Sequence, residues 1–317
     1  MTKIHDALTR LSMYVDQLKA SKANEFRHVT EDIKKMLTKE LSNVKYETLD
    51  GLSRADLNRM IERLRRGMNR VFNQHAKELL AWLKQFMIVT RKLVLQVMFY
   101  ETVKRITNDD EELEENLKEN YWSDKSEPLE DDKTTFLPLL MWASIAKRPM
   151  QVNGSLIATT ISSVAASTVA NVVKITRNAW SNGDTIKDTL DAYVAAFDKA
   201  RGQNGATTAT AMQQIYLQSK AVVMSAYYKE YVWVSILDKA TSDICRSRNG
   251  NRYRFGSGIL PPAHYRCRSH IEPYTGTPPD DRDFDTWLSS QPKSVRDSAN
   301  EALTLGKFAE RIKLILQ

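Results

Sequence analysis

Apolar residues recur at three- and four-residue intervals through residues 1–108, a spacing that predicts helices with one buried face. The clearest stretch follows Ser53, which is suited to the N-cap position, with Asp56 as an acid in the first turn. The apolar stripe of this stretch consists of Leu57, Met60, Ile61, Leu64, Met68, Val71 and Phe72. We interpret the stripe as a core-facing surface; the alternative is a helix that lies on a membrane surface.

Residues 152–173 carry no charge and are long enough for a helix that crosses a bilayer. Ten of these 22 residues are Ser, Thr, Asn or Gly, however, so the segment is less apolar than a membrane span usually is. Small side chains suit a helix that packs closely against others. We therefore expect a buried helix here and no stable membrane span.

Two further helices are expected over 184–201 and 206–231. The residues between them, Gly202-Gln203-Asn204-Gly205, contain two glycines and are read as the break.

The pattern changes after Trp233, where Gly, Pro, Arg and turn-forming residues become frequent. Asn249-Gly250 is a tight-turn dipeptide, and the alternating residues 252–255 that follow it predict a strand. We expect a small β-hairpin here, followed by helix from Phe284 onward. The predicted fold is mainly α, with a helical N-terminal region and a helical C-terminal domain that contains this small α+β module.

Charge divides the chain further. Residues 109–132 contain twelve acids and two lysines, a local charge of −10 in a chain of net charge +7, which leaves +17 on the rest. Such a surplus suits either a polyanionic partner or a solvated basic surface. The predicted domains are 1–108, helical; 109–135, an acidic linker; and 136–317, a C-terminal domain with its motif module at 234–275.

Candidate chemistry is concentrated in that module. Cys245 and Cys267 are the only cysteines of the chain, and His264 lies between them. Two thiols and an imidazole are ligands that zinc prefers, but neither cysteine belongs to a closely spaced pair. A fourth ligand would have to come from Asp238, Asp243 or His270. We expect the two cysteines to lie close together in the fold. Three states stay open: a zinc site, a disulfide, and two reduced buried thiols.

The same segment resembles the C-terminal motif of the phage head-morphogenesis family, the Mu F-like minor head proteins. The resemblance covers about 175–317 and is strongest over 233–273. Many family members have additional cysteines where this chain has Ser242 and Ser269. The matching residues are Asp238, Thr241-Ser242, Cys245, Asn249-Gly250, Pro261-Pro262, His264 and Cys267-Arg268-Ser269.

The resemblance implies a structural virion protein without catalysis, present in several copies in the phage head near the portal vertex, and in the host cytoplasm during assembly. Its implied partners are the portal protein, a capsid or scaffold protein and the phage DNA, with a part in DNA packaging or ejection. Within the motif, we expect Asp238 and Arg268 to form a bidentate ion pair and Asn249-Gly250 to turn the hairpin. The N-terminal helices are the expected contact with portal or capsid.

Two other classes of function are weighed against this one. The first is a zinc-dependent nuclease with His264 as base, although no metal-binding carboxylates stand near this histidine in the sequence. The second is a nucleic-acid-binding protein whose arginines contact phosphates. The candidate contacts are Arg246, Arg248, Arg252, Arg254, Arg266 and Arg268.

Overall fold

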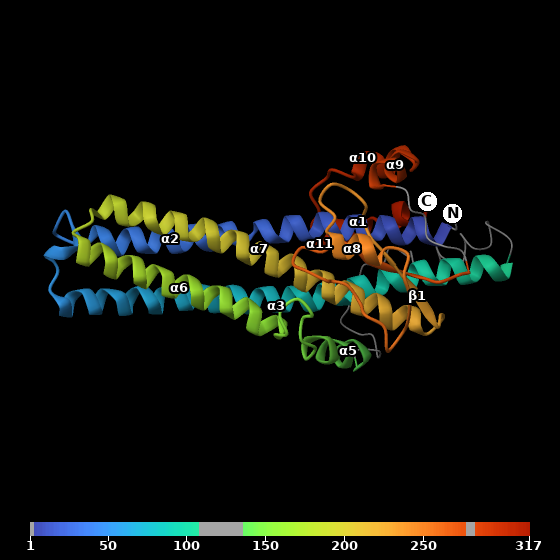
Figure 1. The fold of residues 1–317 in the computed structure, drawn as a ribbon, viewed down its shortest axis with the longest axis horizontal. Helices are drawn as coiled ribbons and strands as arrows, with labels where there is room; N and C mark the ends of the chain where they lie inside the picture. Colours follow the sequence, from blue (N-terminus) through green and yellow to red (C-terminus); the bar gives the residue numbers. More distant parts are fainter. Residues whose placement is uncertain (1–2, 108–135, 277–282) are drawn as a thin grey trace.

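The computed structural model describes residues 3–107, 136–276 and 283–317. Long helices run side by side along the longest axis, and a smaller module with short strands and helices covers one side near the chain termini (Figure 1). The main helices are α1 (Lys3–Asn24), α2 (Phe26–Ser42), α3 (Arg54–Thr107), α5 (Phe136–Ala146), α6 (Ile157–Asn182) and α7 (Ile186–Ser225), with a short 3-10 turn η1 (Leu49–Gly51).

The predicted helix after Ser53 is confirmed as α3. The Ser53 hydroxyl accepts a hydrogen bond from the backbone N–H of Asp56 at 3.1 Å, which satisfies one free donor of the first turn. The apolar stripe faces the protein interior; Val71 is partly buried and the other six residues are buried. The stripe is thus part of the core, and the membrane-surface alternative is wrong.

Residues 152–173 contribute most of α6, as expected for a helix, but only one face of it is buried. That face packs between α3 and α7. None of the described helices combines the length and the apolar character that a bilayer crossing requires. Gly183 ends α6 in the left-handed conformation, with φ +71°, and the Thr185 side chain then caps α7.

The predicted break at Gly202–Gly205 is wrong, because α7 is continuous through it. Gly205 is buried in α7, and a Cβ added to it would lie 3.6 Å from the Ala23 side chain, so this glycine lies in a helix-packing contact. The expected helix over 206–231 also ends early. α7 stops at Ser225, and strand β1 (Glu230–Val234) begins four residues after the helix cap at Ala226.

The sheet has three antiparallel strands in the order β2-β1-β3, where β2 is Arg252–Arg254 and β3 is His270–Pro273. The strand expected over 252–255 is confirmed. The predicted hairpin with its turn at Asn249-Gly250 is wrong. This dipeptide instead joins helix α8 (Asp243–Arg248) to β2, and β2 and β3 both pair with β1. The chain ends in α9 (Phe284–Ser289), α10 (Lys293–Ser298), α11 (Leu305–Glu310) and α12 (Ile312–Leu316).

Two apolar cores lie along the bundle. One joins α2, the first part of α3, the second part of α6 and the first part of α7. The other joins α1, the later turns of α3 and α7, the sheet and the C-terminal helices. Helices on both sides of the predicted domain boundary share each core. The acidic linker predicted at 109–135 lies outside the described residues.

Candidate functional site

Cys245 and Cys267 meet in the interior of the motif module. Cys245 lies in the first turn of α8, and the capping Ser242 hydroxyl accepts from its backbone N–H at 3.4 Å. Cys267 lies in the loop before β3. Both side chains are buried with the Trp233 ring, and neither forms a disulfide.

The two thiols and His264 face one small volume. The Sγ atoms are 3.7 Å apart, which agrees with the expected proximity, and His264 Nε2 is 3.2 Å from Cys245 Sγ. Two sulfurs bound to one tetrahedral zinc at about 2.3 Å each lie about 3.8 Å apart. The three donor atoms lie within 4.8 Å of one another. This donor set therefore fits three positions of a zinc centre.

The two thiols differ in acidity. Its hydrogen bond with Cys267 lowers the pKa of Cys245 to about 6, although burial acts in the opposite direction. The same hydrogen bond, together with burial, raises the pKa of Cys267 well above its usual range. Cys245 is therefore the more acidic thiol of the pair, and Cys267 would have to release its proton for both sulfurs to bind zinc as thiolates.

None of the three suggested fourth ligands belongs to this group within the described residues. Asp238 is paired with Arg268, and His270 is paired with Glu272 at 2.9 Å. Asp243 is exposed in the first turn of α8. A hollow of about 20 Å³ opens instead beside Ser242, Cys245 and His264. It has room for one water, which could complete a set of three protein ligands.

Polar contacts hold the rest of the motif in place. Arg268 donates to both oxygens of Asp238, at 2.6 and 2.5 Å, which is the bidentate pair expected from the sequence. The Thr241 hydroxyl accepts from the Asp238 N–H at 2.9 Å and donates to the Ile236 carbonyl. The Asp238–Arg268 pair and the hydrogen bonds of Thr241 together fix the segment between β1 and α8.

The remaining motif residues return the chain to the sheet. The Asn249 side-chain oxygen accepts from the Ser235 N–H at 2.8 Å, and the Gly250 N–H donates to the Trp233 carbonyl at 2.9 Å. Gly250 has φ +79°, a conformation that favours glycine. Pro261 and Pro262 are buried and joined by a cis peptide bond.

The arginines proposed as nucleic-acid contacts are engaged in different local interactions. Arg246 donates to the backbone carbonyls of Asp238 and Thr241. Arg248 lies over the Trp233 ring, while Arg252 and Arg254 both pair with Glu230. Arg266 is exposed and points toward α7, where its guanidinium donates to the Gly202 carbonyl at 3.2 Å.

A buried ionic cluster beneath β3 was not predicted. Glu272 accepts from His5 on α1 and from His270, and also from the Thr9 hydroxyl at 3.0 Å. Lys220 on α7 is fully buried nearby, with its Nζ 3.3 Å from the Tyr216 hydroxyl. The members lie up to 267 positions apart along the chain, so no local motif marks them.

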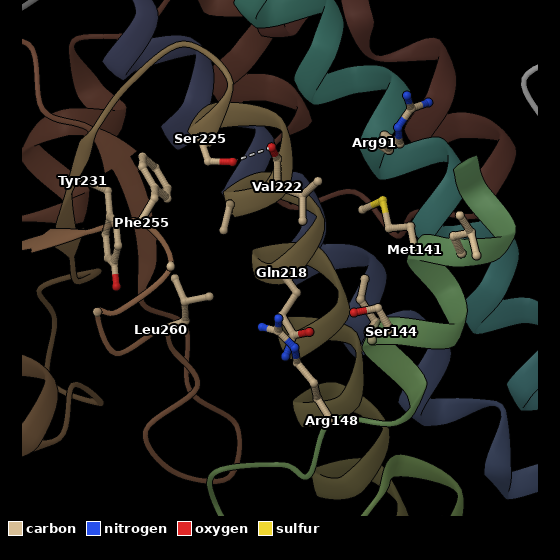
Figure 2. A pocket seen from close by; sticks show the side chains of 15 residues that line it. Arg91, Met141, Ser144, Arg148, Gln218, Val222, Ser225, Tyr231, Phe255 and Leu260 are labelled. Atoms are coloured by element: carbon tan, nitrogen blue, oxygen red, sulfur yellow. Dashed lines mark hydrogen bonds between the residues drawn. The ribbon is translucent and has the colours of Figure 1, made fainter. Parts of the chain in front are cut away.

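A hollow of about 490 Å³ crosses α7 on another face (Figure 2). Tyr231, Phe255 and Leu260 line one side of it, and Met141 and Ser144 of α5 line the other, with Arg148 reaching toward Gln218 between them. The buried Gln218 Oε1 has no hydrogen-bond partner within the described parts of the chain. None of the site residues predicted from the sequence lines this hollow.

The motif module is therefore a compact structure in which two thiols, one imidazole and one ion pair link α8, β1 and the loop before β3. Comparison of the chain with family models, with curated proteins and with solved structures finds no match.

Proposed function

We propose that this chain is a structural minor head protein of a tailed bacteriophage, which associates with the portal and assists procapsid assembly. The proposal rests on the motif resemblance. The observation that supports it best is that Asp238, Cys245, His264, Cys267 and Arg268 gather into one small module. Residues that serve a shared structural purpose are expected to meet in this way.

The contacts of His264 favour a structural role over the nuclease alternative. Its Nε2 faces Ser242 at 2.8 Å and Cys245 at 3.2 Å, and its Nδ1 faces the backbone oxygen of Tyr265. Among the described residues no carboxylate pairs with this imidazole, so a carboxylate that would orient a general base is missing from its contacts. A zinc ion bound by the two thiols and His264 would hold the module together.

The partners implied by this role are the portal protein and a capsid or scaffold protein. Long helices with exposed polar faces extend away from the motif module, and α2 and the first turns of α3 lie at the far end of the bundle (Figure 1). We assign the portal or capsid contact to these N-terminal helices, which leaves the motif module as their scaffold.

Copurification tests the proposal. The tagged chain is coexpressed with the portal protein of the same genome, and the two are expected to coelute from a sizing column and to be found together in purified procapsids. In that genome a portal gene should lie close by. The proposal would be contradicted by a monomer that does not bind the portal protein and that degrades DNA with a divalent metal. In that case His264→Ala should abolish the degradation, and His28→Ala, at an exposed histidine, should not.

A further inference from the structure

A groove of about 750 Å³ lies between the end of α1, the start of α2 and the middle of α7. Small residues line its floor and leave open the space between the helices that larger side chains would fill. These are Ala20, Ala23, Gly202, Gly205 and Ala209. The groove borders the motif module, because Arg266 and Arg268 line both the groove and the hollow beside the thiols.

Five cationic side chains surround the groove, and Asp16 is its only acidic lining residue. They are Lys19, Arg27, Arg201, Arg266 and Arg268. Three of them are already partnered: Lys19 with Asp16, Arg201 with Glu31 and Asp198, and Arg268 with Asp238. Within the described parts of the chain, Arg27 and Arg266 have no acidic partner. The groove therefore presents two uncompensated guanidinium groups beside three partly neutralised cations.

Arg266 is held over the groove by a conformation that arginine rarely adopts. Its φ is +59°, and it is the one non-glycine residue with positive φ in the described chain. Such a conformation costs on the order of 1 kcal/mol or more. The Thr210 hydroxyl accepts from its backbone N–H at 3.0 Å, and its guanidinium donates to the Gly202 carbonyl. Arg266 is exposed and has no acidic partner among the described residues, and strained residues cluster at ligand-binding sites.

We propose that this groove binds the sugar-phosphate backbone of nucleic acid. Four of the five cations are arginines, whose planar fork matches phosphate oxygens, and a floor of small residues lets a strand approach the helix backbones closely. A short acidic peptide could satisfy the same arginines. The nucleic-acid backbone is favoured because the net charge of +17 outside residues 109–132 extends well beyond the groove, as suits a long polyanion.

This site differs from the arginine set suggested by the sequence, with which it shares only Arg266 and Arg268. The binding activity is also independent of the proposed virion role, since purified protein alone can be tested. A chain that binds DNA but does not bind the portal protein would contradict the proposed function without contradicting nucleic-acid binding by the groove.

The test uses the full chain and fluorescently labelled DNA, both single-stranded and duplex, with anisotropy measured over a range of salt concentrations. The variant is Arg27→Ala combined with Arg266→Gly, because glycine keeps the backbone conformation at 266 and so preserves the fold. The matched control is Arg66→Ala with Arg70→Ala, which removes the same charge from the exposed face of α3.

We expect the groove variant to bind at least about tenfold more weakly, with a salt slope reduced by about 0.7 to 0.9 per lost phosphate contact. The control variant should change binding less than about twofold. Equal weakening in both variants, or none in the groove variant, overturns the proposal. Polyglutamate of matched length serves as competitor: if it displaces DNA as well as unlabelled DNA does, the groove recognises acidic chains in general and the nucleic-acid assignment is wrong.

Discussion

Glu272 accepts hydrogen bonds from His5 and His270, which reach it from opposite ends of the chain. Burial tends to raise the pKa of this carboxyl, but its hydrogen bonds with the two histidines, and their charge when they are protonated, outweigh burial and hold the pKa well below its usual range. For His5, burial lowers the pKa, and the bond and charge of Glu272 together raise it above its ordinary value. The carboxylate thus anchors α1 to the sheet.

Lys220, beside this cluster, gives a prediction about pH. Burial lowers its pKa to about 7 from 10.5, with Glu272 opposing the change. Between these values the unfolded chain binds a proton that the folded chain does not, so stability should rise with pH from about 7 to 10. The rise should be on the order of 1 kcal/mol per pH unit. Lys220→Met should remove it, as urea unfolding at pH 7 and 9.5 can measure. Lys77→Met, at an exposed lysine, should retain it, and an unchanged slope in Lys220→Met would contradict the prediction.

The thiols give a second prediction at this scale. Because the donor atoms fit a zinc centre, we expect about one zinc per native chain by metal analysis. Cys245→Ala should lose the metal and unfold the motif module, since metal binding and folding are coupled there. Ser269→Ala, beside Cys267 but outside the donor set, should keep the metal. A metal-free native protein in which Cys245→Ala costs only about 1–2 kcal/mol of stability would indicate reduced buried thiols instead.

At the scale of elements, local signals could be predicted from the sequence and tertiary ones could not. The cap at Ser53 and the stripe of α3 depend on neighbouring residues, and both are confirmed. The glycines at 202 and 205 suggest a break locally, but α7 packs along α1 and α2 there, and burial keeps it helical. Four of the five residues of β1, Glu230–Val234, are β-branched or aromatic, a composition that favours a strand once partners are present on both sides.

Gly202 tests the continuity of α7. A Cβ placed on Gly202 meets nothing within 4 Å, and the residue is exposed within the helix. Gly202→Ala should therefore stabilise the protein by up to about 1 kcal/mol, because alanine loses less backbone entropy in a helix. Thermal or urea unfolding can measure this, with Gly250→Ala as the opposite case, since φ +79° makes alanine strained there. Destabilisation by Gly202→Ala would favour the broken helix that the sequence suggests.

Over the whole molecule, the N-terminal helix is the element that unites distant segments. Arg10 of α1 donates to Gln291 at 2.8 Å, and the Tyr14 hydroxyl bonds with Ser298 at 2.9 Å. The residues of the candidate sites fall into two groups, those that are close in sequence and those that are not. The thiols, His264 and the Asp238–Arg268 pair lie within about thirty residues and could be identified from their spacing. The Glu272 cluster and the basic groove combine α1 and α7 with the module, so spacing along the chain does not mark them.

This architecture predicts that residues 136–317 do not fold alone. Without α1 and α3, apolar residues of α6, α7 and the C-terminal helices would face water. We expect the fragment to show poorly dispersed amide signals in NMR and no cooperative melting, and adding residues 1–107 as a separate chain should restore both. A well-dispersed spectrum from the fragment alone would instead support an independent C-terminal domain.

The position of α1 also bears on how the chain is made. Its buried face, with Leu8, Leu11 and Tyr14, packs beside β3 and on residues of α11 and α12, which are synthesised long after α1. At about 5–20 residues per second, synthesis of such a chain takes on the order of 15–60 s. Throughout that interval the first helix has no complete place to dock. We therefore expect its apolar face to stay partly exposed during translation until α11 and α12 have been synthesised and can cover it.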